Sequence, residues 1–155
     1  MLWINTFFLL SLVVWMGGMI FFASIGAPTI FKTLPPEEAG KVIGAIFPKY
    51  FPMGYFSGFT AFTCLLISAI KTGHWPYGKI LLLIVMLTFQ IYNGLMSYPR
   101  AQTIKEEIQH ETEQENILLL QKEFKQAHRS SVINNMIVLL IGIFLIMLTA
   151  RQLTL

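Results

Sequence analysis

The residues best suited to chemistry lie in the run FKQAHRSSVINN, residues 124–135. Phe124, His128, Ser131 and Asn135 follow one another at spacings of four, three and four, so an α-helix would carry them on one face. That face combines an aromatic ring, an imidazole, a hydroxyl and an amide. Such a set can bind a small solute through hydrogen bonds, and its imidazole could ligate a metal or a haem iron.

A second polar stripe lies earlier in the chain. Gln90, Asn93 and Ser97 are separated by three and four, and Arg100 follows one turn later. An amide that faced lipid would be energetically costly, so this stripe is expected to face protein. The two stripes together predict a polar mouth made of Gln90, Asn93, Arg100, His128, Ser131 and Asn135. The alternative is that these amides and hydroxyls only join neighbouring helices by hydrogen bonds.

The elements that position these side chains are predicted to cross a membrane. Of the 155 residues, 55% are hydrophobic and only 12% are charged, and the mean hydropathy is +0.63. A helix needs roughly 20 apolar residues to span a bilayer. The four predicted spans, each inside an uncharged stretch, are residues 2–26, 50–70, 80–97 and 130–150. The sequence therefore predicts an all-α, integral membrane four-helix bundle that forms a single membrane domain, residues 1–155.

Two further helical segments are predicted between the spans. Pro35 and Pro36 favour a helix start and Pro48 favours an end, which predicts a short interfacial helix at about 35–47. Spans three and four are expected to extend into a cytoplasmic helical hairpin at about 100–129. In that hairpin the run TEQE, starting at Thr112, matches a capping box that begins the second helix.

The first span carries a packing face. Ser11, Trp15, Gly18 and Phe22 are spaced four, three and four apart, and a small residue beside aromatic residues allows close helix approach. Trp15, Gly17 and Gly18 are accordingly predicted to pack against a neighbouring helix. The glycine pair could instead form a kink or a ligand notch.

The basic residues predict the orientation. Eight of the 11 Lys and Arg fall in the loops after spans one and three, which places these loops in the cytoplasm and both termini outside. The first apolar run lacks a basic start and is too long for a signal peptide, so we expect it to be retained as a span. We expect the protein in a bacterial cytoplasmic (inner) membrane.

Several motifs resemble a known family. WMGGMIFF, APTIFKTLPPEEAGKVIGAIFPKYF, YPR and FKQAHRSSVINN occur in an order similar to that of the transmembrane protein 205-like family, four-span proteins grouped under a domain of unknown function. The resemblance covers nearly the whole chain, implies the fold and the membrane location, and brings no established chemistry. The matching positions are Trp15, Gly17, Gly18, Pro28, Phe31, Leu34, Pro35, Phe47, Pro99, Arg100, Phe124, His128, Ser131 and Asn135.

A more distant resemblance links the four-span plan to copper-resistance D proteins and membrane protoporphyrinogen oxidases, and this would imply haem. Those relatives have a histidine early in span one, where this chain has NTFFLL. None of His74, His110 and His128 lies in the middle of a predicted span, so a haem held by two histidines across the bundle is not expected. No cofactor is predicted, and haem ligation by His128 alone remains an alternative.

The sequence contains no phosphate loop, no Ser-His-Asp set and no CxxC motif, so no enzyme is predicted. His110 lies among glutamates, a pattern read as a solvated charged face rather than a metal site, and no metal is predicted. No basic stripe supports nucleic-acid binding. We expect a non-enzymatic protein that contacts the lipid bilayer and binds or passes a small solute, metal or haem-type ligand at the polar mouth. The alternative is a scaffold or accessory subunit of a larger membrane complex, possibly a redox complex, with membrane-protein partners or as a homo-oligomer.

Overall fold

The computed structural model describes residues 1–153 and arranges them as four long antiparallel helical rods, with no strand among them. Each rod is long and apolar enough to cross a membrane. The four candidate spans are Leu2–Thr33, Pro36–Thr72, Tyr77–His110 and Gln114–Arg151. The prediction of an all-α integral membrane bundle is confirmed, and apolar side chains on the outside of the rods contact the lipid bilayer.

Short irregular turns divide two of the rods. The first rod consists of α1 (Leu2–Phe21), the π-helical turn η1 (Phe22–Gly26) and α2 (Ala27–Thr33). The second rod is the single helix α3 (Pro36–Thr72). The third rod consists of α4 (Tyr77–Tyr92), the π-helical turn η2 (Asn93–Ser97) and α5 (Tyr98–His110). The fourth rod is the single helix α6 (Gln114–Leu153).

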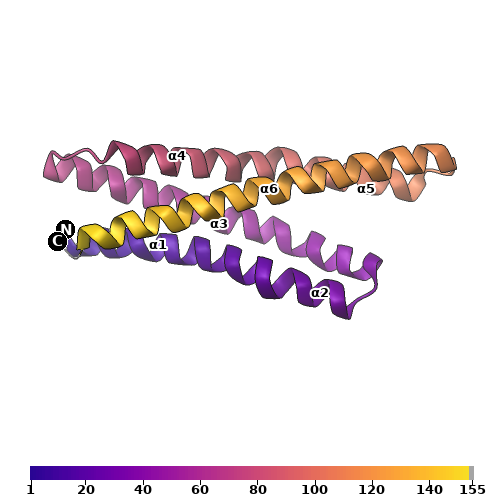
Figure 1. Ribbon diagram of the computed structural model, residues 1–155, viewed down its shortest axis with the longest axis horizontal. Coiled ribbons are helices and arrows are strands. Elements are labelled where there is room, and N and C mark those ends of the chain that lie inside the picture. The colour runs from indigo at the N-terminus through magenta and orange to yellow at the C-terminus, as the bar shows by residue number, and fades with distance from the viewer. Residues whose placement is uncertain (154–155) are drawn as a thin grey trace.

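The two ends of the bundle differ. Both termini lie at one end together with the turn between α3 and α4, which we call the terminal end (Figure 1). The turns that follow α2 and α5 lie at the opposite end, where the α5–α6 hairpin reaches beyond the α2–α3 turn. We call this the hairpin end. At the terminal end Gly73 stops α3 in a left-handed conformation, with φ 69°, that side chains other than glycine rarely adopt.

The core lies along the axis of the bundle, in the part that crosses the membrane. Trp15 is the largest fully buried side chain, and it packs over α3 where two glycines one turn apart, Gly54 and Gly58, leave room for its ring. Other fully buried apolar side chains fill the axis on its terminal side, and they come from three rods. These are Leu12, Leu83, Met86, Val138 and Leu145.

The predicted end of the interfacial helix at Pro48 is wrong. Residues 36–47 are helical, but the helix continues through Pro48 and Pro52 into the second span. A proline removes the hydrogen bond to the carbonyl four residues earlier, which for Pro48 is that of Gly44. The Tyr98 hydroxyl of α5 donates a hydrogen bond of 2.9 Å to this carbonyl oxygen, and Gln102 Nε2 donates to the same hydroxyl at 2.8 Å. A neighbouring helix thus satisfies the carbonyl group that Pro48 leaves free.

We predict that Tyr98→Phe lowers the free energy of unfolding by about 1 kcal/mol, because the Gly44 carbonyl then loses its donor. A Pro48→Ala chain regains a backbone donor for that carbonyl, so Tyr98→Phe should have almost no effect in that background. The four proteins of this double-mutant cycle are compared by unfolding in mixed detergent micelles. An equal loss in both backgrounds would show that the Tyr98 hydroxyl does not act by satisfying the carbonyl that Pro48 leaves free.

The hairpin is present, but its cap differs from the predicted one. The Glu111 carboxylate, rather than the Thr112 side chain, accepts the backbone N–H groups of Thr112 and Glu113, at 2.8 and 3.1 Å. These hydrogen bonds favour the charged form and hold the pKa of Glu111 below its usual value. As predicted, the helix that follows runs without a break into the fourth span.

Candidate functional site

A cluster of asparagine side chains joins the third rod to the fourth. Asn93, the first residue of η2, is fully buried, and its Nδ2 donates to Asn135 Oδ1 at 3.2 Å and to the Ser131 carbonyl oxygen at 3.4 Å. Asn134 Nδ2 donates to Asn93 Oδ1 at 3.1 Å. We call Asn93, Asn134 and Asn135 the amide cluster. Its hydrogen bonds satisfy the Asn93 side chain and fix the register between the two rods.

The next polar side chain toward the terminal end, Gln90, is different. It is fully buried, and neither Nε2 nor Oε1 has a hydrogen-bond partner among the described residues. The indole Nε1 of Trp15 is likewise buried without a partner in the described chain. Both groups lie against Gly54: a Cβ built there would stand 3.3 Å from Trp15 Nε1 and would clash with the Gln90 amide. We call Trp15, Gly54 and Gln90 the Gln90–Trp15 site.

This arrangement is energetically unfavourable for an isolated chain. A buried donor or acceptor without a partner costs about 1–3 kcal/mol, and native proteins contain few of them. The Gln90–Trp15 site gathers two donors and one acceptor at the same glycine, inside an apolar surrounding where each hydrogen bond to a ligand would be strong. A small neutral molecule that both accepts and donates hydrogen bonds would satisfy these groups.

An aromatic layer closes the bundle on the hairpin side of this site. Rings from η1, α3 and α5 contact one another with centroid separations between 5.2 and 5.8 Å. They belong to Phe22, Phe47, Tyr50, Phe51 and Tyr98. The prolines of α3 and the turns η1 and η2 lie next to this layer in the sequence, and π-helical turns are frequent at functional sites.

Comparison with known proteins gives a family and no chemistry. The model of a domain of unknown function, DUF4149, matches residues 10–110, which is well over half of the chain. The chain belongs to the DUF4149 family. No curated protein and no solved structure matches it. The prediction that the chain falls under a domain of unknown function is thereby confirmed.

The match to DUF4149 includes the whole Gln90–Trp15 site and Asn93, whereas the α6 side of the amide cluster lies outside it. In this DUF4149 protein the predicted polar mouth is only partly assembled. Asn93, Ser131 and Asn135 come together, with Ser131 contributing its backbone carbonyl. Gln90 is buried beside them along α4 without a hydrogen bond to them.

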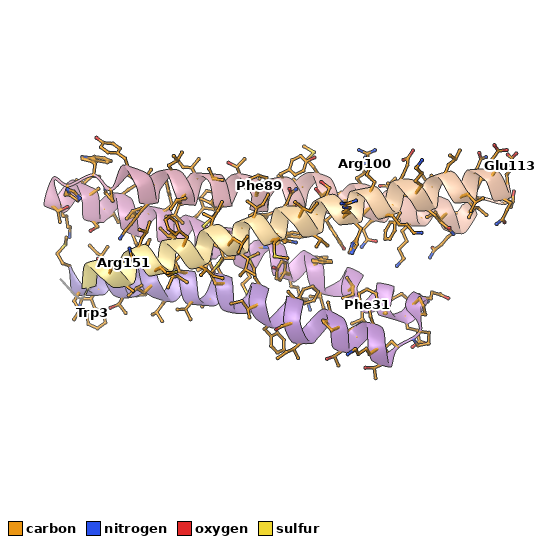
Figure 2. The ribbon with its side chains drawn as sticks, in the orientation of Figure 1. Trp3, Phe31, Phe89, Arg100, Glu113 and Arg151 are labelled. Atoms are coloured by element: carbon orange, nitrogen blue, oxygen red, sulfur yellow. The ribbon has the colours of Figure 1, made fainter. Side chains whose placement is uncertain are left out.

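The two charged or titratable members of the predicted mouth lie apart from the amide cluster. His128 is exposed and stacks on Phe124 of its own helix, with ring centroids 6.3 Å apart. Arg100 is also exposed, in the half of the DUF4149 protein that leads into the hairpin (Figure 2). Among residues 1–153 no three His, Cys, Asp or Glu side chains come together as metal ligands.

The predicted packing face of the first span is largely present. Trp15 and Ser11 are buried, and a Cβ on Gly18 would meet the end of the Met53 side chain at 2.5 Å, so Gly18 permits the contact with α3. Gly17 does not pack within the chain: it is exposed, with nothing within 4 Å of its Cβ position. Successive residues of a helix point about 100° apart, so only one glycine of the pair can face α3.

Sequence reasoning missed two members of the site. The helical spacing that selects Asn135 leaves out Asn134, the preceding residue, although the amides of both residues hydrogen-bond to Asn93. Gly54 was missed as well. The spacing of Gly54, Gly58 and Ala61 along α3 marks a small-residue face and could have indicated a place where a large side chain enters.

Proposed function

We propose that this protein is a non-enzymatic multi-pass membrane protein that binds a small, neutral, hydrogen-bonding ligand at the Gln90–Trp15 site. The supporting observation is the Gln90 amide, which is fully buried with neither its donor nor its acceptor paired in the described chain. An amide and an indole are uncharged at all ordinary pH values, which favours a neutral ligand. Neither group is a nucleophile or an acid–base catalyst, so we assign the site no reaction.

The surroundings of the site support binding rather than passage. Along the buried face of α4, Leu83 and Met86 follow Gln90 toward the terminal end, and both are fully buried. Leu12 from α1 and Leu145 from α6 belong to the same apolar cluster. A polar solute that crossed the bundle would have to pass through this apolar plug, which offers no hydrogen bonds to replace those to water.

The proposal is tested by purifying the protein and its Gln90→Met variant side by side in native-lipid nanodiscs. Organic extracts and metal contents of both samples are compared by mass spectrometry. We expect a small organic species at near one-to-one stoichiometry in the wild type and its loss from the variant. Extracts that are identical would contradict the proposed function.

A second candidate, an accessory subunit of a larger membrane complex, is favoured by the hairpin. Leu118 and Leu119 lie near the start of α6, outside the apolar part of the fourth span, and are 58% and 57% exposed. Two adjacent exposed leucines in the polar first part of α6 are a surface that a partner could cover. Large subunits that co-purify with the wild type and are lost with Leu118→Ser, Leu119→Ser would favour this candidate.

For the orientation, we propose that the hairpin end lies in the cytoplasm of a bacterial cell and both termini lie outside. Eight of the 11 Lys and Arg lie toward that end. A cysteine at Gln109, in a Cys64→Ala background, should react with a membrane-impermeant thiol reagent only after the cells are opened. A control cysteine at His74, which is exposed in the turn at the terminal end, should react in intact cells. Labelling of Gln109→Cys in intact cells would reverse the orientation.

A further inference from the structure

Tyr55 carries a further buried polar atom beside the Gln90–Trp15 site. In the described part of the chain, every buried side-chain nitrogen or oxygen without a hydrogen-bond partner belongs to Trp15, Tyr55 or Gln90. Tyr55 directly follows Gly54, the residue against which the other two groups lie. Its hydroxyl lies against Gly94 in η2, where a built Cβ would overlap it. Because Gly94 comes about one helical turn after Gln90, the Tyr55 hydroxyl extends the site toward the hairpin end.

Tyr55 also lies at the surface that faces lipid. The residue as a whole is half-buried although its hydroxyl oxygen is fully buried, so its side chain reaches inward from the outside of the bundle. Its surroundings on that surface are apolar, with Phe56 of α3 76% exposed and Met96 of η2 61% exposed. Gly94 contributes no side chain, and the atoms nearest to its Cβ position belong to Tyr55 and Phe51. We call the contact between Tyr55 and Gly94 the lipid seam, because a turn of the Tyr55 side chain away from Gly94 would open it to the bilayer.

The three residues with unpaired atoms define the chemistry of a ligand. An indole, a primary amide and a phenol offer three donor groups but only one group that accepts without also donating from the same atom, the amide oxygen. A ligand that satisfies them must therefore bring acceptors. A carbonyl oxygen is a neutral acceptor with two lone pairs, whereas a carboxylate or phosphate would carry a charge that is costly to bury among uncharged groups.

The rings beside the lipid seam favour a flat carbonyl compound. Phe51 and Tyr55 stack with centroids 6.5 Å apart, and Phe51 belongs to the aromatic layer. A planar ring can continue such a stack, whereas the ester of a glyceride cannot. Building on the ligand proposed above for the Gln90–Trp15 site, we propose that it is a lipid-soluble molecule with a ring carbonyl, of the quinone type. It enters from the bilayer through the lipid seam and accepts a hydrogen bond from the Tyr55 hydroxyl.

Trp15 provides the reporter for a direct test, because a quinone quenches the fluorescence of a tryptophan beside it. Trp3→Phe and Trp75→Phe, at two exposed positions, leave Trp15 as the single tryptophan of the chain. In nanodiscs, decylubiquinone should quench this emission with a saturable component. Gln90→Met should abolish that component.

Tyr55→Phe in the same background tests the role of the hydroxyl. It keeps the ring and removes one hydrogen bond to the ligand, so the affinity for decylubiquinone should fall about tenfold. Tyr92→Phe is the matched control, because Tyr92 lies on the third rod and is 51% exposed, and it should leave the affinity unchanged. Equal affinities of Tyr55→Phe and Tyr92→Phe would overturn the assignment of Tyr55.

The length of the ligand tail tests the route. Ubiquinone-10 built into the nanodisc should also quench Trp15, because its long tail can stay in the bilayer while its ring passes the lipid seam. Dioctanoylglycerol, a neutral ester lipid, should not displace decylubiquinone. Quenching by the tailless duroquinone and not by ubiquinone-10, or displacement by dioctanoylglycerol, would overturn the proposal.

The organic extracts that test the proposed function keep the two proposals distinguishable when Tyr55→Phe is included. A ligand lost from Gln90→Met but retained in full by Tyr55→Phe, or one without a ring carbonyl, would leave the proposed function standing and overturn the quinone-type ligand. Identical extracts from the wild type and both variants would overturn both. A ring-carbonyl species present in the wild type and reduced in both variants is the expected result.

Discussion

Replacing Trp15 with alanine is expected to lower the free energy of unfolding by about 3–5 kcal/mol, the usual range for a buried tryptophan. Its side chain is 1% exposed and fills the space over two glycines of α3. A Cβ on Gly58 would stand 2.8 Å from Trp15 Cζ3, so the ring lies directly on the helix backbone. Alanine would leave a cavity that the rods cannot close, because Leu12 and Leu87 already pack around it.

Trp3 provides the matched control. It lies on the same helix and is 75% exposed, so Trp3→Ala removes lipid contacts without opening a cavity, and we expect a change below about 0.5 kcal/mol. Both variants and the wild type are unfolded reversibly in mixed detergent micelles and followed by circular dichroism. Similar losses for the two tryptophans would show that the first rod does not pack through Trp15.

Asn93→Leu is expected to have the second-largest effect, a loss of about 2 kcal/mol. Interhelical hydrogen bonds in membranes average only about 0.6 kcal/mol. Here the Asn93 side chain bonds both Asn134 and Asn135, and its removal leaves these two half-buried amides without that partner. Asn116 is the control, because its amide donates hydrogen bonds to the Glu111 and Glu113 carboxylates at the hairpin turn. We expect Asn116→Leu to change the free energy of unfolding little. If the two leucine variants lose the same stability, the amide cluster does not join the rods.

The spans could be predicted from the sequence because the cost of placing charge in lipid confines the charged residues to the ends of the rods. The continuation of the helix through Pro48 could not be predicted. A proline weakens a helix locally, but here the Tyr98 hydroxyl compensates by donating to the carbonyl of Gly44, which is 54 residues away in the sequence. Only the tertiary structure brings that donor to the Gly44 carbonyl.

The site shows the same limit. Helical periodicity placed Asn93 and Asn135 on facing stripes, and the structure joins them. Periodicity also placed His128 on the stripe of Asn135, but it carries no information on where a neighbouring rod ends or turns away, and His128 is exposed. The meeting of Gln90 with Trp15 depends on the register between the first and third rods, which no local pattern specifies.

The stability of Gln90→Met, measured on purified protein stripped of small molecules, tests the central proposal most directly. Methionine is close to glutamine in shape, so the variant keeps the packing over Gly54 and removes two buried polar atoms that have no partner in the described chain. If the Gln90 amide serves a ligand, its removal should leave the free energy of unfolding unchanged or raise it by about 1–2 kcal/mol. Asn93→Leu, measured in the same series, should lower it. A loss of stability in Gln90→Met as large as that in Asn93→Leu would show that Gln90 holds the helices together, and would contradict the ligand site.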